Sequence, residues 1–214
     1  MTSDASADRL GDRPESWPVD GSSDLHRDAW VVALRTDRVR RPAAAGPDEG
    51  FDRIVLEHPG AAVVLALDEQ DRVFCLAQYR HAAQRRFVEL PAGLCDVAGE
   101  DPVEAARREL REEAGLSAGE WRHLLPTYPS PGISDELVHV YVARALSAAD
   151  RGDFVLEHEE AEMETFWVPF DELLAAVLDG RVTHALVALS VLTCAARGLA
   201  GTRRPGTGKP VANE

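Results

Sequence analysis

Three glutamates stand at positions from which they could act together: Glu109, Glu112 and Glu113. If this segment is helical, residues three and four positions apart share one face, so the three carboxylates lie within reach of one another. Like charges this close destabilise a helix unless a cation neutralises them, and oxygen atoms are the ligands that Mg²⁺ prefers. The alternative is a solvated surface helix, because arginines at 107, 108 and 111 could form salt bridges with the same glutamates.

A helix from Pro102 to Ala114 would present these carboxylates. Its apolar residues recur at helical spacing, Asp101 is placed to cap its N-terminus, and Gly115 is placed to end it. Short apolar and β-branched runs indicate strands at 29–34, 51–57, 61–67, 72–79, 121–128, 137–146 and 163–168. Two further helices are indicated at 171–178 and 183–197, each followed closely by a glycine. These elements predict an α+β fold with a mixed β-sheet.

The chain of 214 residues is long enough for one domain with extensions. Small polar residues dominate 1–24, and Gly, Pro and charged residues follow one another without periodicity through 198–214. Both ends are therefore expected to be poorly ordered, which leaves 25–197 as the folded domain.

The charge balance is strongly acidic, with 23 Lys and Arg against 37 Asp and Glu and a net charge of −14. Nucleic acids and anionic membranes are held by basic surfaces, so neither is expected as a partner. Three cysteines at 75, 95 and 194 form no C-x-x-C pair, and the N-terminus lacks the apolar core of a signal peptide. We therefore expect a cytoplasmic protein without a disulfide framework.

The segment from Gly93 to Leu116 resembles the Nudix box, G-x5-E-x7-R-E-U-x-E-E-x-G-U, in which U is aliphatic. From Glu100 onward every fixed position matches, whereas six residues rather than five separate Gly93 from Glu100. The resemblance implies a Nudix hydrolase whose mixed β-sheet is sandwiched between helices. It also implies catalytic roles for Glu113 and Arg108, and metal ligation by Glu109, Glu112, Glu113 and the backbone carbonyl of Ala92.

Two further features resemble the ADP-ribose pyrophosphatases of this superfamily, most closely the actinobacterial kind. Pro131 lies sixteen residues after Gly115, and the segments 78–81 and 89–93 read Gln-Tyr-Arg-His and Glu-Leu-Pro-Ala-Gly. This resemblance implies Mg²⁺-dependent hydrolysis of ADP-ribose to AMP and ribose 5-phosphate, with Mn²⁺ as an alternative ion. It also implies substrate binding by Arg80, Glu89 and Pro131. Arg80 belongs to a local basic cluster with the arginines at 85 and 86, and arginine forks suit phosphate oxygens.

A general base is expected outside the helix, because a carboxylate bound to a metal is a poorer base. The acidic segment 157–164 precedes a predicted strand, and in the resembling enzymes a loop glutamate at about this place is the catalytic base. Glu160 aligns best with that glutamate, and Glu159 and Glu162 are the alternatives.

The strands expected within 25–58 correspond to an N-terminal antiparallel extension that mediates dimerisation in ADP-ribose pyrophosphatases. The resemblance therefore implies a homodimer. Arg53, together with Trp30 and Phe51, could stack on adenine. Two other functions stay open: a Nudix pyrophosphatase for another nucleoside diphosphate sugar or dinucleotide, and a non-catalytic sensor that binds ADP-ribose.

Overall fold

The structure is a computed structural model that describes residues 10–42, 50–152 and 162–201. The chain divides into two compact units, Met1–Glu57 and His58–Glu214. The division falls next to the end of the segment 25–58 in which we expected a strand extension.

The first unit holds one antiparallel sheet of three strands in the order β1-β2-β3, with β1 at Val19–His26, β2 at Ala33–Val39 and β3 at Phe51–Glu57. The predicted strand at 51–57 is confirmed as β3. The predicted strand at 29–34 is wrong for most of its length, because β2 begins only at Ala33. The expectation of an irregular chain up to residue 24 is also wrong from residue 19 onward.

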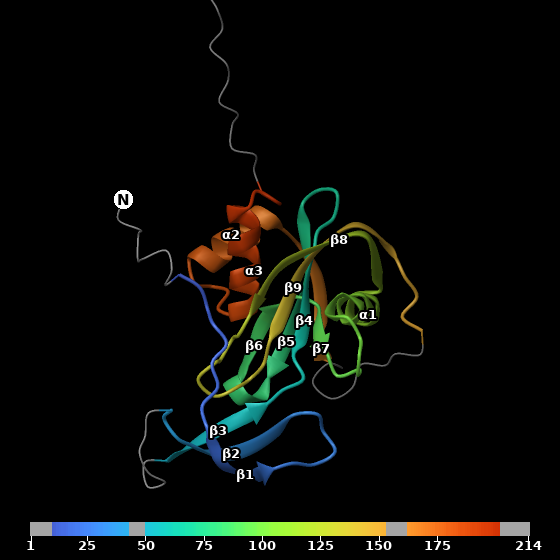
Figure 1. Cartoon of the computed structure of the whole chain (residues 1–214). Coiled ribbons are helices and arrows are strands. Elements are labelled where there is room, and N and C mark those ends of the chain that lie inside the picture. The colour runs from blue at the N-terminus through green and yellow to red at the C-terminus, as the bar shows by residue number, and fades with distance from the viewer. Residues whose placement is uncertain (1–9, 43–49, 153–161, 202–214) are drawn as a thin grey trace, which may run out of the picture. The chain divides into compact units, whose positions relative to one another are not determined.

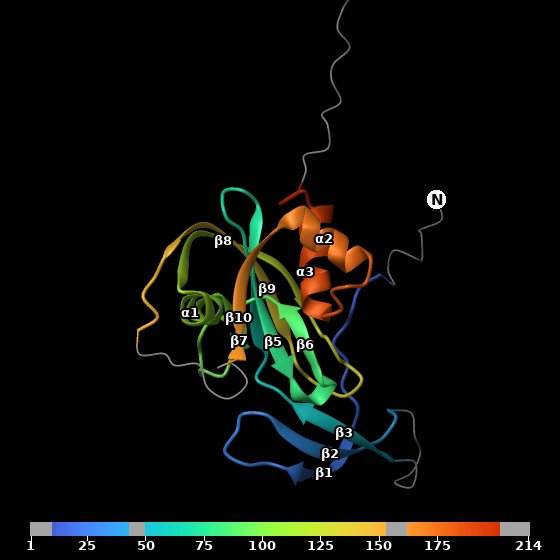
Figure 2. The ribbon, with the colours of Figure 1, turned by 180° about the vertical axis from the view of Figure 1, so that it is seen from behind.

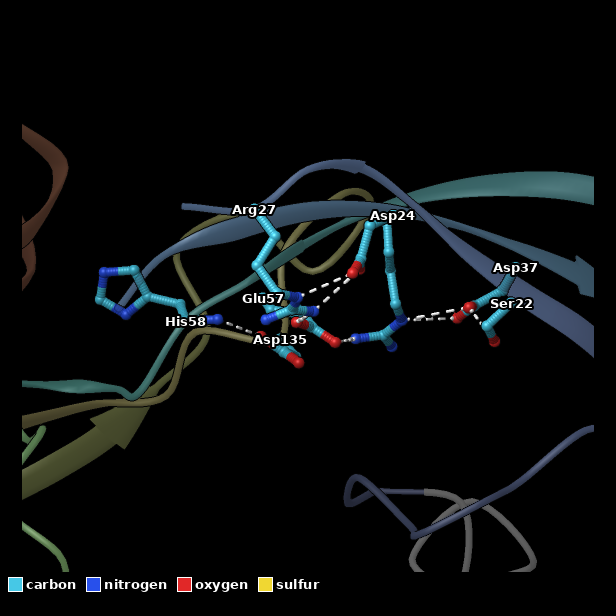
Figure 3. A network of polar contacts seen from close by, with 8 residues as sticks. Ser22, Asp24, Arg27, Asp37, Glu57, His58 and Asp135 are labelled. Carbon is cyan, nitrogen blue, oxygen red and sulfur yellow. Dashed lines mark hydrogen bonds and ion pairs between the residues drawn. The ribbon is translucent and has the colours of Figure 1, made fainter. Parts of the chain in front are cut away.

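The first strand escaped sequence analysis because no apolar face builds it. All eight residues of β1 are exposed, so its sequence shows no alternation of apolar and polar residues. Backbone pairing with β2 holds it, helped by a hydrogen bond of 2.6 Å from Ser22 Oγ to Asp37 Oδ1. Arginines 27 and 35 both donate to the carboxylate of Glu57, which ties the ends of the three strands together (Figure 3).

The second unit contains two sheets, in the orders β10-β5-β6 and β7-β4-β9-β8. The strands are β4 (Ala61–Ala66), β5 (Arg72–Arg80), β6 (Arg85–Glu89), β7 (Ala92–Leu94), β8 (Leu116–Thr127), β9 (Val138–Ala148) and β10 (Glu164–Pro169). A short 3₁₀ turn, η3, covers His81–Ala83 between β5 and β6. Strands β4 and β9 run parallel while all other pairs are antiparallel, so the second sheet is mixed.

Three helices cover these sheets: α1 (Pro102–Ala114), α2 (Phe170–Leu178) and α3 (Ala185–Ala196). Both views show α1 on one side of the sheets and α2 with α3 on the other (Figures 1 and 2). Strand β4 lies between them, with Ala62 and Val64 in the apolar cluster that includes α1, and Val63 and Leu65 in the cluster that includes α3. This alternation is what a strand buried on both faces requires. The predicted α+β fold, a mixed sheet sandwiched between helices, is confirmed.

The helix α1 has the predicted bounds. The Asp101 carboxylate accepts a hydrogen bond of 3.0 Å from the backbone N–H of Val103, and Gly115 ends the helix in the left-handed region at φ +65°. Strands β6 and β7 were missed. Strand β6 begins with two arginines, and β7 is three residues long within the Pro-Ala-Gly segment that reads as a break.

The three cysteines are free thiols. In the three described ranges, none of the helices has both the length and the apolar character needed to cross a membrane.

Candidate metal and phosphate site

The face of α1 that packs against β7 carries the three glutamates singled out by their spacing. Glu109 and Glu113 are buried, at 8% and 5% exposed, and the Glu112 side chain is only slightly more accessible. The predicted sharing of one face is therefore confirmed. The alternative of a solvated surface helix is wrong for these residues, although Glu104 and Arg107 do form an exposed ion pair on the same helix.

The short strand β7 is shaped around two of these carboxylates. The backbone N–H of Ala92 donates a hydrogen bond of 2.9 Å to Glu113 Oε2. At the next residue, a Cβ built on Gly93 would overlap the carboxylate of Glu109. The Pro-Ala-Gly segment therefore brings a backbone donor and a residue without a side chain against the helix. Glycine at position 93 lets the Glu109 carboxylate occupy this space, and a larger residue would force that side chain to move.

Arg108 lies among the carboxylates and links them to β7. Its Nη1 donates to Glu109 and lies 3.7 Å from Glu112 Oε2, and its Nη2 donates to Leu94 O at 3.1 Å. Burial alone would lower the pKa of Arg108, but the carboxylates of Glu109, Glu100 and Glu112 raise it above its ordinary value. Arg108 is therefore a fixed cation that neutralises part of the buried acid.

The extra residue before Glu100 leaves that side chain beside the site. Glu100 Oε2 lies 3.5 Å from Arg108 Nη2, so the longer loop still delivers its carboxylate to the same arginine. Glu100 is thus part of the acidic cluster around Arg108.

The residues around α1 suit a hard divalent cation. The donors are all oxygens, and the two arginines Arg108 and Arg111 cannot balance the four carboxylates of Glu100, Glu109, Glu112 and Glu113. Within the ranges 10–42, 50–152 and 162–201, however, no three His, Cys, Asp or Glu side chains are already gathered as ligands. The glutamates that would hold an ion have instead turned toward Arg108 and the Ala92 amide.

Arg80 and Glu89 face each other across the hairpin of β5 and β6. Arg80 Nε donates to Glu89 Oε1 at 2.9 Å and Arg80 Nη2 donates to Glu89 Oε2 at 2.6 Å, an ion pair with two parallel hydrogen bonds. His184, which precedes α3, places its Nε2 3.8 Å from Glu89 Oε1. The structure thus brings two of the predicted substrate residues together and adds a histidine that sequence analysis missed.

Pro131 lies in the loop between β8 and β9 and is exposed. The loop turns tightly after it, because the N–H groups of Ile133 and Ser134 both donate to the carbonyl of Ser130. Its far end is anchored by Asp135, whose carboxylate accepts a hydrogen bond of 2.8 Å from the backbone N–H of His58 (Figure 3).

The remaining predicted residues are Arg53 and the three candidates for the general base. Arg53 belongs to the first unit, where its guanidinium lies 4.3 Å from the centroid of the Phe51 ring. Glu159 and Glu160 lie outside the described residues. Glu162 is described, and its carbonyl accepts a hydrogen bond of 2.9 Å from Arg86 Nη1.

His184 offered no local signal in the sequence. It stands alone between Thr183 and Ala185, far along the chain from Glu89, and only the packing of α3 against β6 brings the two side chains together. The role of Gly93 in accommodating Glu109 was missed for the same reason, because it depends on a tertiary contact.

Comparison with known proteins identifies the family of this chain. A family model described as the NUDIX domain matches residues 56–187. An ADP-ribose pyrophosphatase of Mycobacterium tuberculosis is 43% identical over 171 residues, which is 80% of this chain and 79% of that protein. A Streptomyces rubellomurinus protein named as a CMP-5'-(N-acetyl-N-hydroxy-3-aminopropyl)phosphonate hydrolase is 37% identical over 191 residues, 89% of this chain and 87% of that protein.

The fold also has a counterpart among solved structures. A protein described as an ADP compounds hydrolase superposes with a TM-score of 0.69, covering 88% of this chain and 98% of its own, at 16% identity. At that identity the likeness shows the fold alone. The family model covers more than half of the chain, and the M. tuberculosis relative is 43% identical over most of both chains: the chain belongs to the Nudix family.

Proposed function

We propose that this chain hydrolyses the pyrophosphate bond of ADP-ribose, using Mg²⁺, to give AMP and ribose 5-phosphate. The observation that carries the proposal is the pair of buried glutamates, Glu109 and Glu113, held on one face of α1 against β7. The relative from M. tuberculosis, which is named for this activity, supports the choice of substrate.

Glu109, Glu112, Glu113 and the carbonyl of Ala92 would hold the ion. When bound, a divalent cation offsets the negative charge of the phosphates and lowers the pKa of a coordinated water. Arg108 keeps the glutamates close together by neutralising part of their charge. Mn²⁺ would serve as an alternative ion, because its geometry and oxygen preference are similar.

Arg80 would bind a phosphate oxygen of the substrate, since a guanidinium presents several donors in a planar fork. Glu160 would accept the proton of the attacking water, with Glu159 and Glu162 as the alternatives. Water adds to one phosphorus, the bond between the two phosphates breaks, and each product leaves with one phosphate. Pro131 would contact substrate from the loop between β8 and β9, and Arg53 would stack on adenine.

The choice of substrate can be tested directly. Purified protein with Mg²⁺ should hydrolyse ADP-ribose with a higher kcat/KM than it shows for NADH, GDP-mannose, diadenosine polyphosphates or a CMP-linked phosphonate. The last compound is included because the S. rubellomurinus relative is named for one. A higher kcat/KM for another member of the panel would overturn ADP-ribose as the substrate, and binding of ADP-ribose without any turnover would favour a sensor.

The role of the buried glutamates predicts the effect of a neutral replacement. Glu113→Gln should reduce kcat/KM by about 10²-fold or more, because it removes a charge that the cation needs. Its amide oxygen can still accept the hydrogen bond from Ala92, so the thermal unfolding temperature should stay close to that of wild type. Turnover and circular dichroism melting measure the two effects.

A matched control for this variant lies on the same helix. Glu104→Gln removes an exposed carboxylate of α1 that pairs with Arg107, and it should leave turnover near wild type. Comparable losses in both variants would contradict a specific role for Glu113.

Loss of the proposed general base should change both kcat and its dependence on pH. Glu160→Gln should lower kcat by roughly 10²-fold and remove the acidic limb of the pH–rate profile, because the group that accepts the proton is lost. Glu159→Gln and Glu162→Gln serve as parallel variants. The role belongs to whichever of the three produces this pair of changes.

We also propose that the chain forms a homodimer through the first unit. Monomeric proteins seldom leave many large apolar side chains exposed in one region. The first unit exposes Val19, Leu25, Trp30, Val31 and Ile54, with Trp30 at 66%. A second copy of the chain would cover such residues.

If the first unit forms the dimer interface, charged side chains placed on its strands should prevent dimerisation. Wild type should sediment at twice the chain mass of 23.3 kDa, and the double variant Leu25→Glu/Ile54→Glu should sediment as a monomer. Leu178→Glu alters an equally exposed leucine of α2 and should stay dimeric. A wild-type protein that is monomeric at all concentrations would rule the dimer out.

A further inference from the structure

The carboxylate of Glu89 is almost entirely enclosed by its neighbours. Its side chain is 4% exposed, and each of its two oxygens accepts a hydrogen bond from Arg80. A substrate would have to displace Arg80 to reach it. Glu89 therefore has the environment of a residue that acts on Arg80 rather than on a ligand.

The two members of this pair differ in exposure. The Arg80 side chain is 47% exposed, whereas the carboxylate that holds it is buried. A buried carboxylate is costly to leave unpaired, so it holds its partner strongly. The two parallel hydrogen bonds also fix the plane of the guanidinium, which reduces the freedom that Arg80 would lose on binding a phosphate.

His184 completes the surroundings of Glu89. Its Nε2 lies 3.8 Å from Glu89 Oε1, the oxygen that Arg80 Nε also contacts. Its ring packs edge-on against Phe87 at 5.8 Å between centroids, and its Nδ1 is buried with no hydrogen-bond partner among the described side chains and backbone.

The charge state of His184 determines whether a second cation competes with Arg80 for the Glu89 carboxylate. Burial lowers the pKa of His184; Glu89 on β6 acts in the opposite direction, and Arg80 on β5 lowers it further. The lowered pKa favours the neutral ring over the charged one. A neutral ring leaves the negative charge of Glu89 to Arg80, while a cation at this distance would share it.

We propose that Glu89 and His184 are positioning residues that act through Arg80. Glu89 fixes the guanidinium in the orientation that receives a phosphate oxygen, and His184 keeps competing cations and water away from the buried carboxylate. The inference rests on the proposed function only in that Arg80 must meet a phosphate of the substrate.

A double-mutant cycle tests whether Glu89 acts through Arg80. Glu89→Gln should raise KM about ten-fold and change kcat by less than about two-fold, because it removes the charge that orients Arg80 but leaves the reacting groups in place. Arg80→Met should raise KM at least as much. The double variant should have the KM of Arg80→Met alone, since without the arginine Glu89 has nothing to position.

Additive effects of Glu89→Gln and Arg80→Met on KM would overturn the proposal, because Glu89 would then contact the substrate itself. The matched control is the other ion pair of the same strand, Arg72 with Asp68, which lies at the opposite end of β5. Asp68→Asn should leave KM unchanged. A rise in KM there would mean that loosening β5, rather than losing orientation at Arg80, causes the effect.

Two variants that differ in the charge at position 184 test the role of His184. His184→Lys supplies a permanent cation that competes for Glu89 and should raise KM as Glu89→Gln does. The neutral polar variant His184→Gln should recover most of that loss. Equal KM values for the two variants would show that the charge at position 184 does not matter.

A second measurement needs neither a substrate nor a working site. In NMR titrations of the His184 ring, Arg80→Met should raise its pKa by removing a nearby cation, and Glu89→Gln should lower it by removing a nearby anion. An unchanged pKa in both variants contradicts the coupling. If the wild-type protein turns over a different panel substrate, the proposed function fails and the cycle is carried out with that substrate instead.

Discussion

The burial of the α1 carboxylates against β7 is the constraint on which the rest of the second unit depends. Carboxylates crowded on one helix face repel one another, and burial in a medium of low polarity strengthens the repulsion. Arg108 donates a hydrogen bond to Glu109, and the Ala92 amide donates one to Glu113. Gly93 leaves room for the Glu109 carboxylate where a side chain would collide with it. All three features serve one arrangement, in which α1 packs against the three-residue strand β7.

The same constraint explains why the central strand β4 is uniformly apolar. Strand β4 lies between β7 and β9 and is buried on both faces, by α1 on one side and by α3 on the other. Its residues are small opposite α1, where Ala62 and Ala66 contribute to the cluster that contains Leu110. Small side chains there allow the helix to lie close, and a close helix delivers Glu109 and Glu113 to β7.

What sequence could predict follows from which interactions are local. The bounds of α1 were predictable because Asp101 and Gly115 act on the helix that they flank, and the strand at 61–67 because burial makes its sequence continuously apolar. Strand β1 was not, since backbone pairing holds an exposed strand together without an apolar face. The site divides in the same way: the spacing of three glutamates on one helix is local, whereas the contact of His184 with Glu89 exists only because α3 packs on β6.

The net charge of −14 is compatible with a polyanionic substrate because the acidic residues have different roles in two parts of the site. Around α1 the carboxylates outnumber the arginines that pair with them, which suits a cation that would itself attract phosphate. At Arg80 a buried carboxylate cancels much of the charge of the guanidinium while fixing its plane. A pair of this kind attracts an anion from a distance less strongly than a free arginine would. Its advantage is geometric, because an oriented fork discriminates between phosphate positions and loses less entropy on binding. We infer that two parts of the site act differently on the phosphates of the substrate. The cation near α1 would attract them, and the buried Glu89 would fix the orientation in which Arg80 binds them.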